Sequence, residues 1–213
     1  MGSSDQKELR KSFPAIASGN EEGQSVSSGH QDVKIKVAGL VHDYFGNMIF
    51  VLRQHAGDGK VSIEPPGGKL EDGETLISGT RRELGEELGG FHLTRVDEKV
   101  LVSIEDVFRK AKGEQPQKRC TYYMDCKTVL GFHFNALPNE HLAILHVPVF
   151  KPQSVDAISA SYHEMKSYAL ASAQKKLDQL GIVPNGKIEF RLPEKAFSAY
   201  YQASLSGMRS ELL

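Results

Sequence analysis

The stretch "PPGGKLEDGETLISGTRRELGEELGG", residues 65–90, combines seven glycines with six acidic residues. Apolar residues recur along one side of residues 75–88 at helical spacing, and Gly89 follows as an exit that tolerates left-handed backbone. These apolar residues are Ile77, Leu84 and Leu88. The stretch therefore predicts a loop, a helix over 75–88 and a second loop.

Three carboxylates share one side of this predicted helix. At about 100° per residue, Glu83, Glu86 and Glu87 lie within an arc of roughly 100°. Their mutual repulsion is unfavourable, and the interior glycines Gly79 and Gly85 each cost about 1 kcal/mol relative to alanine. Such a helix is typical of a cation site, and oxygen ligands favour Mg²⁺ or Mn²⁺ bridged to phosphate oxygens. The alternative is a solvated acidic face.

The spacing of the polar residues decides between these two readings. Gly68, five residues, Glu74, seven residues and then "RELGEELG" at 82–89 resemble the Nudix hydrolase signature G-x5-E-x7-R-E-U-x-E-E-x-G-U, in which U is a bulky apolar residue. Only the last position departs from it, because Gly90 stands where the apolar residue is expected. The resemblance extends over roughly residues 33–180. It implies an α/β fold, an α/β/α sandwich around a mixed β-sheet.

The resemblance also implies a chemistry and roles for particular residues. Family members hydrolyse a nucleoside diphosphate linked to another moiety, with Mg²⁺ or Mn²⁺ as cofactor. By matching position, Glu83, Glu86 and Glu87 are metal ligands, together with the backbone carbonyl of Gly67. Four further positions serve the architecture of the motif: Gly68, Glu74, Arg82 and Gly89.

The general base has two candidates. Many members carry it on a loop after a later strand, where Glu140 precedes an apolar run, and Glu83 competes with it. The neighbouring His141 is a weaker candidate, since most such histidines are structural or exposed.

Residues outside the motif bear on the class of substrate. Arg53 and Gln54, followed by Glu64-x-Pro66, resemble the corresponding residues of Nudix enzymes that act on ADP-ribose and nucleoside diphosphate sugars. The proline that marks many ADP-ribose enzymes beyond the motif is absent. Phe108 lies near the place of a tyrosine in dinucleoside polyphosphate hydrolases, which keeps that class and nucleoside triphosphates open.

A basic segment, 109–119, offers another possibility. Its cations include Lys118 and Arg119, which are able to bind extra phosphates or an RNA 5′ end. A solvated loop is the preferred interpretation, because the segment contains Gly, Pro and Gln but no interleaved aromatic residues.

The rest of the chain is expected to consist of strands followed by helices. Residues 1–31 are predicted to be disordered, 32–192 to form the Nudix domain and 193–213 a helical C-terminal extension. An amphipathic helix is predicted from Ser154 to Leu180 and a shorter one after Pro193. The predicted strands cover 33–41, 48–54, 61–64, 99–106, 119–130 and 141–150.

Composition limits the remaining choices. The net charge is −1, which argues against a surface built throughout for nucleic acid. No apolar run reaches transmembrane length, and two cysteines, Cys120 and Cys126, suit a reducing compartment, so a soluble cytoplasmic monomer or homodimer is expected. A non-catalytic binding or scaffold module of the same fold is the alternative, but such a module would be expected to have lost glutamates of the motif.

Overall fold

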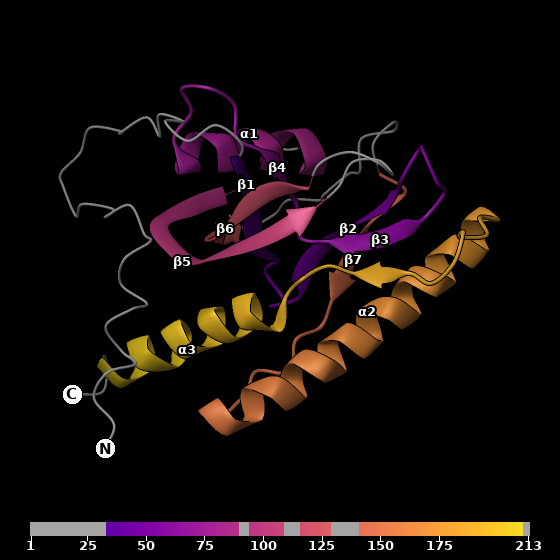
Figure 1. Ribbon diagram of the computed structural model, residues 1–213. Helices are drawn as coiled ribbons and strands as arrows, with labels where there is room; N and C mark the ends of the chain where they lie inside the picture. The colour runs from indigo at the N-terminus through magenta and orange to yellow at the C-terminus, as the bar shows by residue number, and fades with distance from the viewer. Residues whose placement is uncertain (1–32, 90–93, 109–115, 129–140, 211–213) are drawn as a thin grey trace, which may run out of the picture.

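The computed structural model describes residues 33–89, 94–108, 116–128 and 141–210. Its layers run helix, sheet, helix, with α1 on one face of a mixed sheet and α2 and α3 on the other (Figure 1). This arrangement confirms the predicted α/β sandwich. The helical elements are α1 (Leu76–Leu88), the 3-10 turn η2 (Val155–Ala157), α2 (Ile158–Leu180) and α3 (Glu194–Ser210).

The described strands form one sheet of eight strands. The strands are β1 (Val33–His42), β2 (Met48–Gln54), β3 (Val61–Glu64), β4 (Gly67–Lys69), β5 (Thr94–Phe108), β6 (Gln117–Thr128), β7 (Ala143–Val147) and β8 (Glu189–Phe190). The order is β5-β6-β1-β2-β3-β8, with β4 paired to β1 and β7 paired to β2. The pairs β1–β6 and β3–β8 are parallel, and the others are antiparallel.

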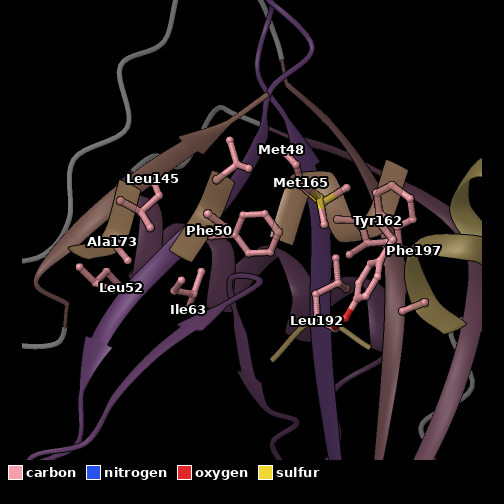
Figure 2. Packing of buried hydrophobic residues seen from close by; sticks show 14 of the residues in the cluster. Met48, Phe50, Leu52, Ile63, Leu145, Tyr162, Met165, Ala173, Leu192 and Phe197 are labelled. Atoms are coloured by element: carbon pink, nitrogen blue, oxygen red, sulfur yellow. Dashed lines mark hydrogen bonds between the residues drawn. The ribbon is translucent and has the colours of Figure 1, made fainter. Parts of the chain in front are cut away.

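The sequence of strand β2 is an unbroken apolar run because both faces of the strand are buried. Residues Met48, Phe50 and Leu52 point to the α2/α3 side of the sheet, whereas Ile49 and Val51 point to the α1 side. All five are buried, since helices cover both faces. Figure 2 shows the larger of the two cores, in which Phe50 lies among side chains from β3, β7 and α2.

Helix α1 begins and ends where its flanking residues satisfy the free backbone groups. Thr75 is the N-cap, and its hydroxyl accepts a hydrogen bond from the Ser78 amide at 3.1 Å. Gly89 ends the helix in the left-handed conformation, with φ at 71°. Leu84 packs so closely on β1 that a Cβ added at Gly39 would lie 3.0 Å from its Cδ2 atom. The helix is therefore held close to the centre of the sheet.

The predicted helix at 154–180 is present with one change at its start. A 3-10 turn covers its first residues, and the α-helix then runs to Leu180, followed by Gly181. The central part of the predicted apolar stripe is buried: Ile158, Tyr162, Met165, Ala169, Ala173 and Leu177. Its two ends, Val155 and Leu180, are 57% and 45% exposed, because the stripe extends beyond the sheet that it covers.

The C-terminal segment is built into the same core. Strand β8 adds to the sheet beside β3, and the Tyr162 hydroxyl donates to the Leu192 carbonyl at 2.8 Å. On α3, Phe197 and Tyr201 are buried against the α2 side of the core. The segment after residue 188 therefore contributes to the main body of the protein. None of the described helices is long and apolar enough to cross a membrane.

Candidate active site

The acidic motif depends on the absence of a side chain at Gly68. A Cβ added there would overlap the whole carboxyl group of Glu83, at distances well inside the 3.0 Å below which real Cβ contacts essentially do not occur. Glu83 is nearly buried, with 8% of the residue exposed. Gly68 lies on β4 and pairs with Val37 of β1. The first glycine of the motif thus leaves room for the carboxyl group of Glu83, the first glutamate of the motif on α1.

Arg82 joins four parts of the motif. Each of its five N–H groups makes a hydrogen bond of 2.8–3.0 Å. The partners are Glu74 through Nε and Nη2, Glu83 and Glu86 through Nη1, and the Lys69 carbonyl through Nη2. Glu74 also accepts a hydrogen bond from the Glu71 amide at 2.9 Å. This network fixes the loop before α1 to the acidic side of the helix.

Glu87 connects the helix to the strands. Its Oε2 accepts a hydrogen bond from the Gly67 amide at 2.7 Å, and its Oε1 lies 2.6 Å from Nη2 of Arg53 on β2. The imidazole of His141 is completely buried, with Nε2 at 3.4 Å from the same Oε1. Within the described residues, neither ring nitrogen of His141 has a hydrogen-bond partner. Glu87 therefore links α1 to β4 and β2 through these two contacts.

Carboxylates outnumber cationic groups in this site. Burial raises the pKa of Glu83, and the charges of Glu87 and Glu86 raise it further, although Arg82 opposes both. Hydrogen bonds from Arg82 hold the pKa of Glu74 below its ordinary value. Four carboxylates face two guanidinium groups, those of Arg82 and Arg53, which leaves a formal charge of −2.

This donor set fits a divalent cation in chemistry and in charge. It consists of hard oxygen atoms, and its excess charge of −2 matches Mg²⁺ or Mn²⁺. In this structure no three carboxylate, imidazole or thiol groups of the described part of the chain converge as a metal site. The two guanidinium groups hold the carboxylate oxygens instead. Glu86, whose side chain is 53% exposed, has room to turn.

A cleft of about 980 Å³ opens beside this cluster. Gly67, whose amide binds Glu87, belongs to its lining, so the acidic helix and the cleft adjoin at β4. Alternate residues of β6, namely Arg119, Thr121 and Tyr123, line one side of it. Residues 189–193 line the cleft as well. The cleft is therefore assembled from the centre of the sheet and from the C-terminal segment.

The charged residues that line the cleft are balanced, with four Lys or Arg and four Asp or Glu. Three of the four cations are in ion pairs: Lys60 with Asp58 at 3.0 Å, Arg119 with Asp106 at 2.8 Å, and Arg191 with Glu64 at 2.8 Å. Lys36 is the fourth, and its ammonium group has no hydrogen bond or ion pair within the described residues. Most of the positive charge of the cleft is therefore already neutralised.

The residues predicted to contact substrate are placed differently from one another. Arg53 is directed to Glu87 and is not part of the cleft lining. Glu64 does line the cleft, where it accepts hydrogen bonds from Ser62 and Arg191. These partners keep the pKa of Glu64 below its ordinary value in spite of burial.

The basic segment is divided by the alternation of β6. Arg119 lines the cleft, whereas Lys118 is exposed and lies outside the lining. The structure therefore does not bring these two predicted contacts together, because neighbouring residues of a strand point to opposite faces. Several other predicted features lie outside the described residues: segment 1–31, Gly90, positions 109–115, Glu140 and the side chain of Phe108.

Two residues of the cleft were missed by reasoning from sequence. Lys36 stands in a strand that alternates Lys and apolar residues, which gives the lysine the signature of a solvated strand face. Arg191 follows a two-residue strand near the C-terminus, and no motif marks it. A polar residue on an interior strand was the available signal for Lys36.

Both the sequence and the fold are similar to those of known proteins. A family profile described as NUDIX domain matches residues 34–177, from β1 into α2. An 8-oxo-dGTP diphosphatase of Haemophilus influenzae is 40% identical over 52 residues, which make up 24% of this chain. The aligned stretch spans only 38% of that protein.

Two solved structures represent the structural similarities. The MutT protein of Methanosarcina mazei Go1 has a TM-score of 0.44 and 17% identity, over 70% of this chain and 96% of its own. A C. elegans Ap4A hydrolase binary complex has a TM-score of 0.42 and 13% identity, over 70% of this chain and 96% of its own.

Proposed function

Because the chain belongs to the NUDIX domain family, we propose that it hydrolyses a phosphoanhydride bond of a nucleoside diphosphate derivative in the presence of a divalent metal ion. Family membership, predicted from residues 68–89, is confirmed by the profile match over 34–177. The observation that supports the proposed site is the acidic cluster of excess charge −2 beside a cleft of about 980 Å³.

The metal ion is proposed to be Mg²⁺, with Mn²⁺ as the alternative. Glu83, Glu86 and Glu87 would hold it together with the carbonyl of Gly67. When bound, such an ion neutralises phosphate oxygens and lowers the pKa of a coordinated water. The chain itself contributes an oxygen cluster that is fixed on one side by Arg82 and on the other by the Gly67 amide.

The residues of the chain have separable tasks in this proposal. Arg82 and Glu74 keep the loop and α1 in register, since their bonds join the two. Arg53 keeps Glu87 in place from β2. The base that accepts the proton of the attacking water is Glu83 or Glu140, the two candidates indicated by the sequence. Burial raises the pKa of Glu83 above that of an ordinary glutamate.

The charges of the cleft favour a substrate with a short phosphate chain. Three of its four cations are already paired with acids. A long polyphosphate or an RNA 5′ end would bring more negative charge than the cleft neutralises. A diphosphate held mainly by metal requires less. Tyr123, Tyr162 and Phe190 add an aromatic lining for the remainder of the substrate. ADP-ribose or a nucleoside diphosphate sugar is therefore the proposed substrate.

A nucleoside triphosphate is the second candidate. It is favoured by the 40% identity, over 52 residues, to a protein named 8-oxo-dGTP diphosphatase. A non-catalytic module is disfavoured, because every glutamate of the motif is present in this chain.

A competition assay decides among these substrates. ADP-ribose, a nucleoside triphosphate, a dinucleoside polyphosphate and 5′-triphosphorylated RNA are supplied with Mg²⁺ at two salt concentrations. We expect kcat/KM for ADP-ribose or a nucleotide sugar to exceed the others by at least about tenfold, equivalent to roughly 1.4 kcal/mol of transition-state binding. Preference for RNA or the longer phosphate chains, with a steep loss of activity in salt, would refute the substrate proposal.

A further inference from the structure

Among the described residues, Lys36 differs from the other cations of the cleft in that its ammonium group has no ion-pair partner. Lys60, Arg119 and Arg191 each lie within 3.0 Å of a carboxylate. The ammonium group of Lys36 has neither a hydrogen bond nor an ion pair within the part of the chain that the structure describes. The residue is half-buried. A half-buried cation without a partner is unfavourable unless something else compensates its charge.

The position of Lys36 connects the cleft to the acidic helix. On β1 it pairs with Lys69 of β4, and two residues further along β1 Ala38 pairs with Gly67. The amide of Gly67 is the group that binds Glu87. Two residues of a strand span roughly 7 Å, so Lys36 stands about one phosphate group away from the proposed metal end of the cleft.

The strand alternation directs Lys36 into the cleft. Ala38 and Leu40, at the following alternate positions of β1, pack into the core under α2 and α3. Lys36 continues this row at the point where the core gives way to the cleft. The next cleft-lining position across the parallel pair with β6 is Thr121, a small polar residue. Lys36 therefore lines the cleft together with polar residues such as Thr121 and aromatic residues such as Tyr123.

Charged groups of both signs act on the ammonium group of Lys36. Burial lowers its pKa, Glu64 and Glu87 raise it, and Arg119 and Arg53 lower it. The two acids and the two guanidinium groups act in opposite directions, and these acids are themselves bonded to Arg191 and Arg53. An anionic ligand in the cleft is the group that would supply the missing charge.

We propose that Lys36 binds a phosphate oxygen of the substrate, on the cleft side of the bond that is hydrolysed, and so is a specificity-determining residue for substrates with at least two phosphates. The inference rests on the proposed function for the identity of the substrate. Lys36 contacts the phosphate group that the metal end of the cleft leaves unneutralised. It takes no part in proton transfer.

Direct binding measurements separate this role from turnover. ADP and adenosine are titrated calorimetrically into the full-length protein in Mg²⁺ buffer, with wild type, Lys36→Met and Lys36→Arg. Lys175→Met is the matched control, because Lys175 is exposed on α2 and its loss changes the net charge equally. We expect Lys36→Met to weaken ADP binding at least about tenfold and adenosine binding less than about twofold. Lys36→Arg should recover most of the loss, and Lys175→Met should bind as wild type.

Each possible result either supports or overturns phosphate binding by Lys36. Unchanged ADP affinity in Lys36→Met, or an equal loss for ADP and adenosine, would overturn it, as would an absence of ADP binding to the wild-type protein. A Lys36→Arg variant that folds and yet binds as poorly as Lys36→Met would also overturn it. If the wild type binds ADP through Lys36 but cleaves none of the four substrates above, the proposed function fails and the inference stands.

Discussion

Replacing Gly68 with alanine perturbs the site by a single methyl group. The added Cβ would overlap all three atoms of the Glu83 carboxyl group. Backbone atoms of β4 cannot yield easily, since this strand is paired to β1, so the carboxylate has to move. Gly85→Ala is the matched control, because a Cβ at Gly85, three residues before the end of α1, meets nothing within 4 Å.

The two variants should change stability in opposite directions. Overpacking at Gly68 costs about 1 to 3 kcal/mol, which for a protein of this length lowers Tm by about 2 to 12 °C. Alanine at Gly85 removes about 0.5 to 1 kcal/mol of unfavourable helix propensity and raises Tm by about 1 to 4 °C. Displacement of Glu83 by about 1 Å or more should reduce kcat by roughly 100-fold in Gly68→Ala.

Thermal unfolding and Mg²⁺-dependent hydrolysis of the preferred substrate measure both effects. Gly85→Ala should retain wild-type activity, since its methyl group points into open space. Wild-type stability and activity in Gly68→Ala would show that the carboxylate of Glu83 does not occupy the place seen here, and the account of the first glycine would be wrong.

Two further predictions concern the carboxylates of α1 and the loop before it. Glu86→Gln and Glu87→Gln keep the size of the side chain but remove its charge, so affinity for the divalent ion should fall and turnover should drop by several orders of magnitude, as measured by calorimetry and hydrolysis assays; normal turnover in both variants would contradict the metal assignment. The pKa of Glu74 is lowered by Arg82, so its stabilising contribution is present above pH 4.5 and is lost as the pH falls through the folded-state pKa. Urea unfolding should therefore find Glu74→Gln less stable than wild type at pH 7, with a difference that shrinks below pH 4.5; a constant difference would exclude this ion pair as the cause.

The acidic helix was predictable because the residues that determine its ends and its apolar side lie within the helix or next to it in the sequence. The N-terminal end, the αL exit at Gly89 and the apolar contacts of Leu84 and Leu88 all follow from local spacing. The strands at 48–54 and 61–64 were found at their predicted bounds, since short apolar runs between turn residues mark them. Here local preference and tertiary packing agree.

Other elements depend on partners that are distant in the sequence. Strand β4 has three residues, two of them glycines, and exists because it pairs with β1. Strand β8 has two residues, paired with β3. Strands β5 and β6 extend to 94–108 and 117–128, beyond or shifted from 99–106 and 119–130, because their mutual pairing sets their length.

The same dependence on distant partners limits what the sequence indicates about the candidate site. The three glutamates of the motif share one helix, so their common side could be worked out from periodicity alone. The cleft is formed by residues from several strands and from the C-terminal segment, and its ion pairs, such as Arg191 with Glu64, join positions 127 residues apart. The local sequence does not show which lysines and arginines form ion pairs with acids that are distant in the chain. The sequence marks Lys36 as a polar residue on a strand, but that its ammonium group has no partner among the described residues could be seen only after its neighbours had been placed.

Residues 189–193, which form one wall of the cleft, are synthesised long after helix α1. Helix α1 ends at Leu88, so about 100 further residues must be translated before this wall exists. At 5 to 20 residues per second, that interval is about 5 to 20 s. During this time the nascent chain carries the acidic helix but lacks the residues that complete the cleft. The cleft is thus completed last, and a ribosome that stalls before residue 189 yields a chain with the glutamates of α1 but without this wall of the cleft.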